Sequence, residues 1–207
     1  MTEDHPIFLE SIRFIKSQLS PNYLKEQETK VLERLIHTSG DFSIQDLLIF
    51  SENACERGIK AIKNKAPILT DTDMAAAAIK SMALKVGLNQ IFSASKWFDQ
   101  QKDFSKTKTA FGIEQGWMEI SKNNFGNKAP IVIFGSSPTA LEGLLDILEK
   151  SDQEPSLIVG MPVGFIGVEQ SKIRLTNSNH AYIILGSTRG GAAMAGATIN
   201  ALLRSSI

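Results

Sequence analysis

The sequence predicts a three-layer α/β/α domain around a parallel sheet, and three segments in the last third of the chain carry this prediction. Each is a short apolar run that ends in glycine, at residues 131–135, 157–160 and 183–186. Strands of a parallel sheet read as continuous apolar runs because helices cover both faces. A helix-like stretch follows each run, and strands that alternate with helices imply right-handed crossovers within one sheet.

Length and composition favour one intracellular domain, 1–207. The 207 residues are enough for a full three-layer core. The 22 basic and 22 acidic residues cancel, so the chain lacks the basic stripe of a nucleic-acid-binding protein. Its single cysteine, Cys55, excludes an internal disulfide framework and fits a reducing compartment. The polar amino terminus is no signal peptide, and no apolar run approaches the roughly 20 residues that span a bilayer. We expect a cytoplasmic protein that binds neither nucleic acid nor membrane.

Residues 1–63 are expected to form a helical part that packs on the α/β core. Apolar residues at 8, 12, 15 and 19 define one face of a first helix. A second helix carries apolar residues between 24 and 36 and leads to Gly40, a residue type that commonly ends helices. A third helix, about 52–63, has a basic end that complements the helix dipole.

The rest of the chain alternates strands with helices. Five strands are expected, at 66–70, 89–93, 130–135, 156–160 and 181–186. The helices between and after them are expected at 75–78, 110–121, 138–150, 168–175 and 190–204. Five parallel strands with helices on both faces predict a flavodoxin-like arrangement.

The glycine-rich strand ends suggest a binding edge. In open α/β sheets, ligands bind at the carboxyl ends of the strands. Pro138 follows Ser136 and Ser137 at the start of a predicted helix, whose free N–H groups and partial positive charge favour carboxylates or phosphates. We therefore expect a large, polar, anionic ligand. The alternative is an ordinary capped helix with small residues for close packing.

Arg189 and His37 are the candidate functional side chains. Arg189 precedes two glycines, and arginine binds carboxylates with two parallel hydrogen bonds. Alternatively, it is a surface residue beside a flexible turn. His37 lies at a helix end, where imidazole exchanges protons near neutral pH and the helix dipole favours imidazolium, the form of a general acid. The alternative for His37 is a helix-capping role.

Cofactor motifs are missing from the sequence. It contains neither a G-x-G-x-x-G loop nor a Walker A loop, and neither C-x-x-C nor H-E-x-x-H. Three separated histidines and one cysteine offer little for a metal site. The segment 186–190 superficially resembles a nucleophile elbow, but threonine stands where serine is required. We expect no metal and no cofactor.

Motifs spread over nearly the whole chain resemble one known family. They are R-L-I-H-T-S-G-D at 34–41, A-P-I-L-T-D-T-D-M at 66–74, G-S-S-P-T-A-L at 135–141, G-M-P-V-G-F at 160–165, Ser171-Lys172, and Arg189-Gly190-Gly191. Together they resemble precorrin-8X methylmutase, also called precorrin isomerase. The Met-Pro-Val-Gly-Phe string with a histidine upstream is the most specific part of the resemblance.

This resemblance implies a reaction. The family moves a methyl group from C-11 to C-12 of a corrin macrocycle and gives hydrogenobyrinate or its cobalt-containing counterpart, cobyrinate. No redox change occurs and no cofactor is consumed, so any cobalt would be carried within the substrate. The family is homodimeric, with its active site near the subunit interface. The small-residue helix that follows Gly191 would suit either such an interface or close packing on the sheet.

The resemblance also implies roles for individual residues. His37 would protonate, or donate a hydrogen bond to, a ring nitrogen beside the migrating methyl group. Lys108 stands where the family usually has arginine, which keeps the charge without the bidentate geometry. Ser136 and Ser137 replace an Asn-Ala pair. The positions expected to bind substrate are Ser11, Thr38, Ser39, Thr70, Asp71, Lys108, Gly135, Ser136, Ser137, Thr139, Gly160, Met161, Pro162, Val163, Gly164, Arg189 and Gly190.

Two other functions remain open at this point. A phosphosugar isomerase would use the loop at 135–139 for phosphate and would need a second acid–base group. A corrinoid-binding protein without catalytic activity would keep the pocket without the chemistry, and the presence of His37 argues against it.

Overall fold

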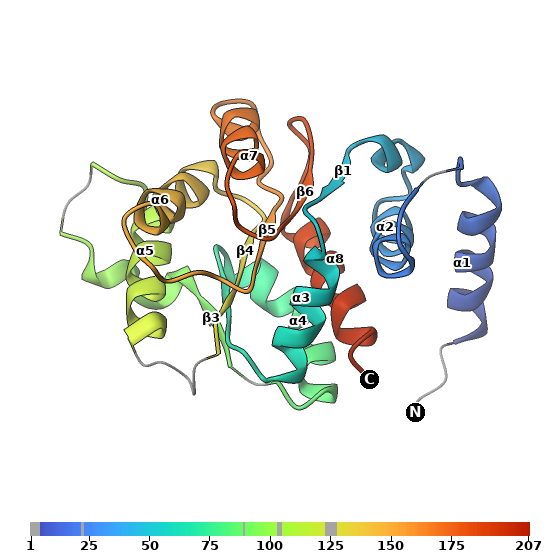
Figure 1. Cartoon of the computed structure of the whole chain (residues 1–207), viewed down its shortest axis with the longest axis horizontal. Helices are drawn as coiled ribbons and strands as arrows, with labels where there is room; N and C mark the ends of the chain where they lie inside the picture. The colour runs from blue at the N-terminus through green and yellow to red at the C-terminus, as the bar shows by residue number, and fades with distance from the viewer. Residues whose placement is uncertain (1–4, 22, 89, 103–104, 123–127) are drawn as a thin grey trace.

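A mixed sheet of six strands forms the centre of the described chain (Figure 1). The computed structural model describes residues 5–21, 23–88, 90–102, 105–122 and 128–207. The strands are Leu48–Phe50 (β1), Ile68–Thr70 (β2), Ile91–Ser93 (β3), Ile131–Phe134 (β4), Leu157–Gly160 (β5) and Tyr182–Leu185 (β6). Their order is β1-β6-β5-β4-β2-β3. Strands β2 to β6 are the five that the sequence predicts, and they run parallel in the flavodoxin-like order.

The prediction of a purely parallel five-stranded sheet is wrong at one edge. There β1 pairs antiparallel with β6, with Leu48 opposite Leu185 and Phe50 opposite Ile183. β1 lies within residues 1–63, which the sequence predicts to be helical, so that expectation is wrong at Leu48–Phe50. An antiparallel strand at the edge of an otherwise parallel sheet is common in α/β folds.

Helices cover both faces of the sheet. The α-helices of the described chain are Pro6–Gln18 (α1), Glu26–Ser39 (α2), Ala54–Lys63 (α3), Asp73–Lys85 (α4), Lys108–Lys122 (α5), Pro138–Leu148 (α6), Val168–Thr176 (α7) and Ala192–Arg204 (α8). Two 3₁₀ helices, Phe42–Asp46 (η1) and Ala94–Gln100 (η2), complete the set. Helix α4 is much longer than the helix predicted at 75–78. None of the helices described here is both long and apolar enough to cross a membrane.

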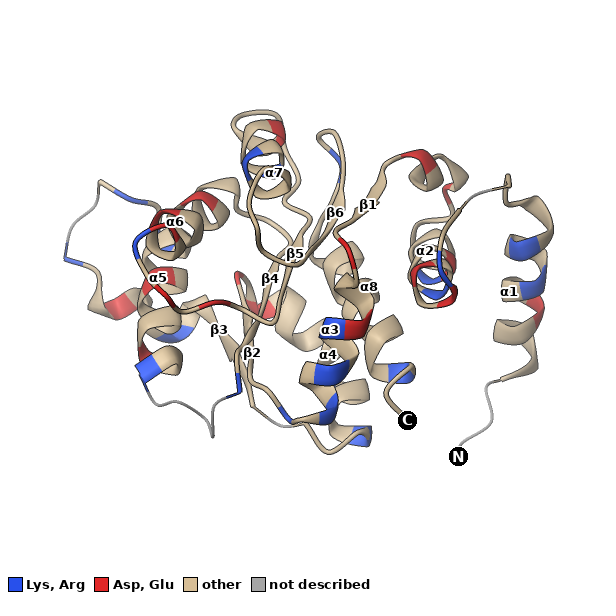
Figure 2. Cartoon of the chain, viewed as in Figure 1, with Lys and Arg blue, Asp and Glu red and all other residues tan. Residues whose placement is uncertain are grey.

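Two apolar cores lie on opposite sides of the sheet, as a three-layer fold requires. In β4, Ile131 and Ile133 join the core shared with α2, α3, α4 and α8, whereas Val132 and Phe134 join the core shared with α5 and α6. Successive side chains of a strand point to opposite faces, so every interior strand contributes to both cores. Strands β4, β5 and β6 carry no charged residue, and Figure 2 shows the charges on helices and loops.

The amino-terminal helices lie at one end of the molecule (Figure 1). Helix α2 packs on α8, and α1 packs on α2. Gly40, the residue after the last residue of α2, adopts a left-handed conformation with φ 68° and so ends the helix. This ending places His37 in the last turn of the helix, near the carboxyl edge of the sheet.

The small residues of α8 serve packing within the chain. Ala195, Gly196 and Ala197 are all buried. A Cβ added at Gly196 would lie 2.6 Å from the Cβ of Ala78 in α4, so only glycine allows this close approach of the two helices. The subunit-interface role considered for this helix does not fit its burial.

Candidate active site

The loops that follow β2, β4, β5 and β6 meet at the carboxyl edge of the sheet. The N–H of Gly191 donates to the carbonyl of Met161 at 2.9 Å, and the N–H of Gly164 donates to the carbonyl of Thr188 at 3.2 Å. A Cβ added at Gly190 would lie 2.1 Å from the Met161 carbonyl oxygen, so glycine is needed for this contact. The sequence correctly predicts that these segments come together.

A cavity of about 370 Å³ opens between these loops and the end of α2. Its lining residues are Ser39, Asp41, Ile44, Val163, Gly164, Phe165, Leu185, Thr188, Arg189, Gly190 and Met194. Five of the predicted substrate-binding positions are among them: Ser39, Val163, Gly164, Arg189 and Gly190. Of the other predicted positions, Gly135, Gly160, Met161 and Pro162 are buried below this surface.

The loop after β4 binds an anion, but that anion belongs to the protein. The carboxylate of Asp71 accepts hydrogen bonds from the N–H groups of Ser136, at 2.6 Å, and Ser137, at 2.9 Å. Asp71 is fully buried, and this burial raises the pKa of its carboxyl group against the opposing effect of the backbone donors. The two amides expected to face a ligand are thus already paired within the chain. The same pairing leaves them unavailable for the phosphate group that a phosphosugar isomerase would bind at this loop.

The hydroxyls of Thr70, Ser137 and Thr139 also have partners within the chain. The Thr70 hydroxyl is buried and donates to the Thr72 carbonyl at 2.9 Å. Ser137 accepts from the N–H of Ala140 at 3.2 Å and caps α6. The Thr139 hydroxyl lies 2.8 Å from the Thr107 hydroxyl, at the start of α5.

Lys108 is exposed at the first position of α5 and does not line the cavity. The structure therefore does not bring this cation to the cavity within a single chain.

His37 and Ser11, which the resemblance named separately, form a pair. The Ser11 hydroxyl lies 2.9 Å from Nδ1 of His37, and the ring of Phe8 meets the imidazole edge to face at 5.1 Å. Burial, and then the charge of Arg34, lower the pKa of His37 below its usual range. Both effects disfavour the imidazolium and so oppose the helix-dipole expectation for His37.

The hydroxyls next to His37 are used inside the helix. Thr38 donates to the Arg34 carbonyl at 2.8 Å, and Ser39 donates to the Leu35 carbonyl at 3.0 Å. These bonds fix the last turn of α2, so both hydroxyls have a backbone acceptor before any ligand arrives.

Arg189 is engaged by a residue for which the sequence argument had no role. Its guanidinium forms an ion pair with Asp41, and Nη1 donates to the Ser43 hydroxyl at 2.6 Å. Asp41 also accepts the Ser43 N–H at 2.9 Å and so caps η1. These hydrogen bonds, those of Ser43 first, lower the pKa of Asp41. The aspartate before a 3₁₀ turn was a detectable capping signal, but its arginine partner lies 148 positions further along the chain.

The fold and the site define an α/β enzyme with a cavity at the carboxyl edge of a parallel sheet and an acid–base side chain, His37, two positions before the lining residue Ser39. Within the described residues, no cluster of three or more His, Cys, Asp or Glu could hold a metal ion. The family model for precorrin-8X methylmutase matches residues 6–205. The chain belongs to this family, and as a member it is an isomerase of cobalamin biosynthesis.

Individual relatives agree with the family match. The chain is 32% identical to a cobalt-precorrin-8 methylmutase of Methanocaldococcus jannaschii, over 88% of this chain and 81% of the relative. It is 31% identical to a precorrin-8X methylmutase of Pseudomonas aeruginosa, over 95% of this chain and 93% of the relative. The solved structure of precorrin-8X methylmutase from Thermus thermophilus superposes with a TM-score of 0.82 at 27% identity, covering 97% of this chain and 95% of that one.

Proposed function

We propose that this chain moves a methyl group from C-11 to C-12 of precorrin-8X or cobalt-precorrin-8, giving hydrogenobyrinate or cobyrinate. The observation that carries the proposal is the Ser11–His37 pair at the last turn of α2. His37 does not itself line the cavity, but Ser39 and Asp41, which follow it in the chain, do. The family match over residues 6–205 supplies the class of substrate.

His37 is the proposed catalytic residue. When the Ser11 hydroxyl donates to Nδ1, the ring proton resides on Nε2, which then donates to a ring nitrogen beside the migrating methyl group. That hydrogen bond draws electron density from the macrocycle while the bond from the methyl carbon to C-11 breaks and its bond to C-12 forms. The shift is intramolecular, so no electron or proton is consumed overall. The rest of the rate enhancement comes from holding the ring in its reactive geometry.

The substrate is proposed to extend beyond the cavity of one chain. About 370 Å³ lies near the lower end of the range for drug-sized ligands, so a tetrapyrrole would reach across its rim. At that rim Phe165 is 90% and Ile166 88% exposed. We propose that a second copy covers these side chains in a homodimer, because exposed apolar patches commonly mark interaction sites.

No cofactor is required in this proposal. Any cobalt enters and leaves within the macrocycle, and the protein supplies only the hydrogen bond and the binding surface. The relatives carry both names, cobalt-precorrin-8 and precorrin-8X methylmutase, so the two substrates are to be compared directly.

The test is to offer the purified chain each substrate and to follow the visible spectrum. The proposal predicts conversion of at least one substrate without added metal or nucleotide. A spectral shift on binding without product formation would instead indicate a corrinoid carrier. An unchanged spectrum with both substrates would refute corrinoid binding.

A further inference from the structure

Lys172 is a buried cation whose partners are backbone carbonyls. It lies on α7 and is only 3% exposed. Its Nζ donates to the carbonyl of Ser187 at 2.8 Å and to the carbonyl of Arg189 at 2.6 Å. Both acceptors belong to the loop between β6 and α8, and Ser187 has φ 60°, a left-handed conformation that is uncommon for serine.

This ammonium group has no carboxylate within ion-pair distance among the residues that the structure describes. Burial lowers its pKa from 10.5 to about 8, while Glu169 acts in the opposite direction. Removing an ammonium from water costs several kcal/mol unless partners compensate, and a methionine of similar length would avoid the cost. Because a lysine at this buried position does not favour stability, a role of Lys172 in function is the better explanation.

The loop held by Lys172 forms one side of the cavity. Thr188, Arg189 and Gly190 line the cavity, and Lys172 binds the carbonyls on either side of Thr188. Through the pairing of Arg189 with Asp41, the same loop contacts the segment that follows α2 and His37. Lys172 itself is not a lining residue, so its ammonium group contacts this loop without reaching the cavity surface.

We propose that Lys172 is a positioning residue for substrate binding: it holds the loop at residues 187–190 in its binding conformation and places a positive charge behind the surface that receives substrate carboxylates. The inference rests on the proposed function, since that function supplies the anionic substrate. It adds a residue on α7 that does not itself touch the cavity.

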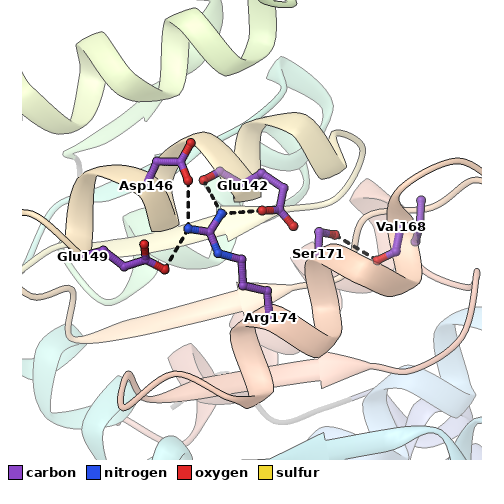
Figure 3. Close-up of polar contacts among 6 residues, drawn as sticks. All are labelled: Glu142, Asp146, Glu149, Val168, Ser171 and Arg174. Atoms are coloured by element: carbon purple, nitrogen blue, oxygen red, sulfur yellow. Dashed lines mark hydrogen bonds and ion pairs between the residues drawn. The ribbon is translucent and has the colours of Figure 1, made fainter.

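Arg174 offers a matched control on the same helix. Its guanidinium contacts Glu142 at 2.5 Å, Asp146 at 2.8 Å and Glu149 at 2.8 Å, all on or next to α6 (Figure 3). Its loss would weaken the packing of α7 on α6 without touching the 187–190 loop. We therefore expect Arg174→Met to lower the stability of the fold without changing substrate binding. We expect Lys172→Met to weaken substrate binding whether or not it changes stability.

The experiment titrates cobyrinate into the wild type, Lys172→Met and Arg174→Met, with thermal unfolding of each and KM and kcat for turnover. Loss of charge-assisted hydrogen bonds predicts at least about a tenfold loss of affinity and an equal rise in KM for Lys172→Met, with kcat within about threefold. Arg174→Met should unfold at a lower temperature and bind within about twofold of the wild type.

Wild-type affinity and KM in folded Lys172→Met would overturn the inference, and so would equal binding losses in the two variants. If Lys172→Met does not fold, Lys172→Gln, which keeps a shorter donor and loses the charge, is judged by the same tenfold criterion. A wild type that binds no cobyrinate would refute the proposed function itself, a result distinct from a wild type that binds and a variant that binds equally well.

Discussion

Among the acidic and basic side chains of the described chain, Asp71 and Lys172 are the least exposed, at 0% and 3%. Each compensates its burial with backbone groups: Asp71 accepts two N–H groups, and Lys172 donates to two carbonyls. Buried charges are tolerated only when such partners are present. At both positions the charge organises a loop at the carboxyl edge of the sheet.

Replacing Asp71 by alanine should destabilise the protein, because the N–H groups of Ser136 and Ser137 would lose their acceptor. We expect the free energy of unfolding to fall by about 2–6 kcal/mol, at about 1–3 kcal/mol for each of the two unsatisfied groups. Urea denaturation measures this change. Asp73→Ala, at an exposed carboxylate that accepts from Ser95, is the control and should cost less than about 1 kcal/mol. Equal effects of the two substitutions would contradict the assigned role of Asp71.

Lys172 predicts a pH dependence of stability. Its pKa falls from 10.5 in the unfolded chain to about 8 in the fold, so between these values the unfolded state binds the proton more tightly. The free energy of unfolding should therefore rise from pH 8 to pH 10 by on the order of 1–3 kcal/mol more in the wild type than in Lys172→Met. Denaturation at several pH values tests this, and parallel curves for the two proteins would contradict it.

At the scale of the elements, the loops after β5 and β6 depend on a glycine contact. A side chain at Gly190 would collide with the backbone of Met161 and Pro162, which has no room to move away as a flexible side chain would. We expect Gly190→Ala to lower the free energy of unfolding by several kcal/mol and to weaken corrinoid binding.

Gly40→Ala provides the comparison for Gly190→Ala. Gly40 has φ 68° but nothing within 4 Å of an added Cβ, so only the backbone strain of about 1–2 kcal/mol applies. Urea denaturation of both variants separates steric exclusion from backbone strain. A smaller loss in Gly190→Ala than in Gly40→Ala would show that the loops accommodate the added methyl group.

The elements differed in how far the sequence could predict them. Strands β4, β5 and β6 are apolar runs that end in glycine, and helices on both faces leave such runs few other interpretations. β1 was not predicted, because its place in the sheet depends on pairing with β6, more than 130 positions away. Local periodicity carries no information about such a partner.

The sequence likewise predicted some features of the candidate site and missed others. His37 and Ser11 came from motif resemblance, and the structure brings the two side chains together. The pairing of Asp71 with the loop at 135–137 and of Arg189 with Asp41 could not be predicted, because each joins residues far apart in the chain. Both pairings occupy groups that seemed free for substrate, so sequence reasoning overestimated the number of available donors.

At the scale of the whole molecule, the proposed homodimer rests on fewer observations than the other parts of the proposed function. The exposed side chains of Phe165 and Ile166 predict where the subunits meet. Light scattering should give about twice the chain mass of 22.6 kDa, and Phe165→Asp should shift the protein towards the monomer and lower turnover. Ile207→Asp, at another exposed apolar residue, is the control. A fully active wild-type monomer would contradict the proposal.

The central claim is that His37 delivers the hydrogen bond that drives the methyl shift. The most direct measurement is kcat of His37→Ala with the preferred substrate, together with cobyrinate affinity. General acid catalysis contributes about 10²–10⁴-fold, so kcat should fall by at least about a hundredfold while affinity changes by less than about threefold. His180→Gln, at a half-buried histidine that precedes β6 and so lies at the opposite edge of the sheet, should keep wild-type kcat. Near-wild-type turnover by His37→Ala would contradict the account.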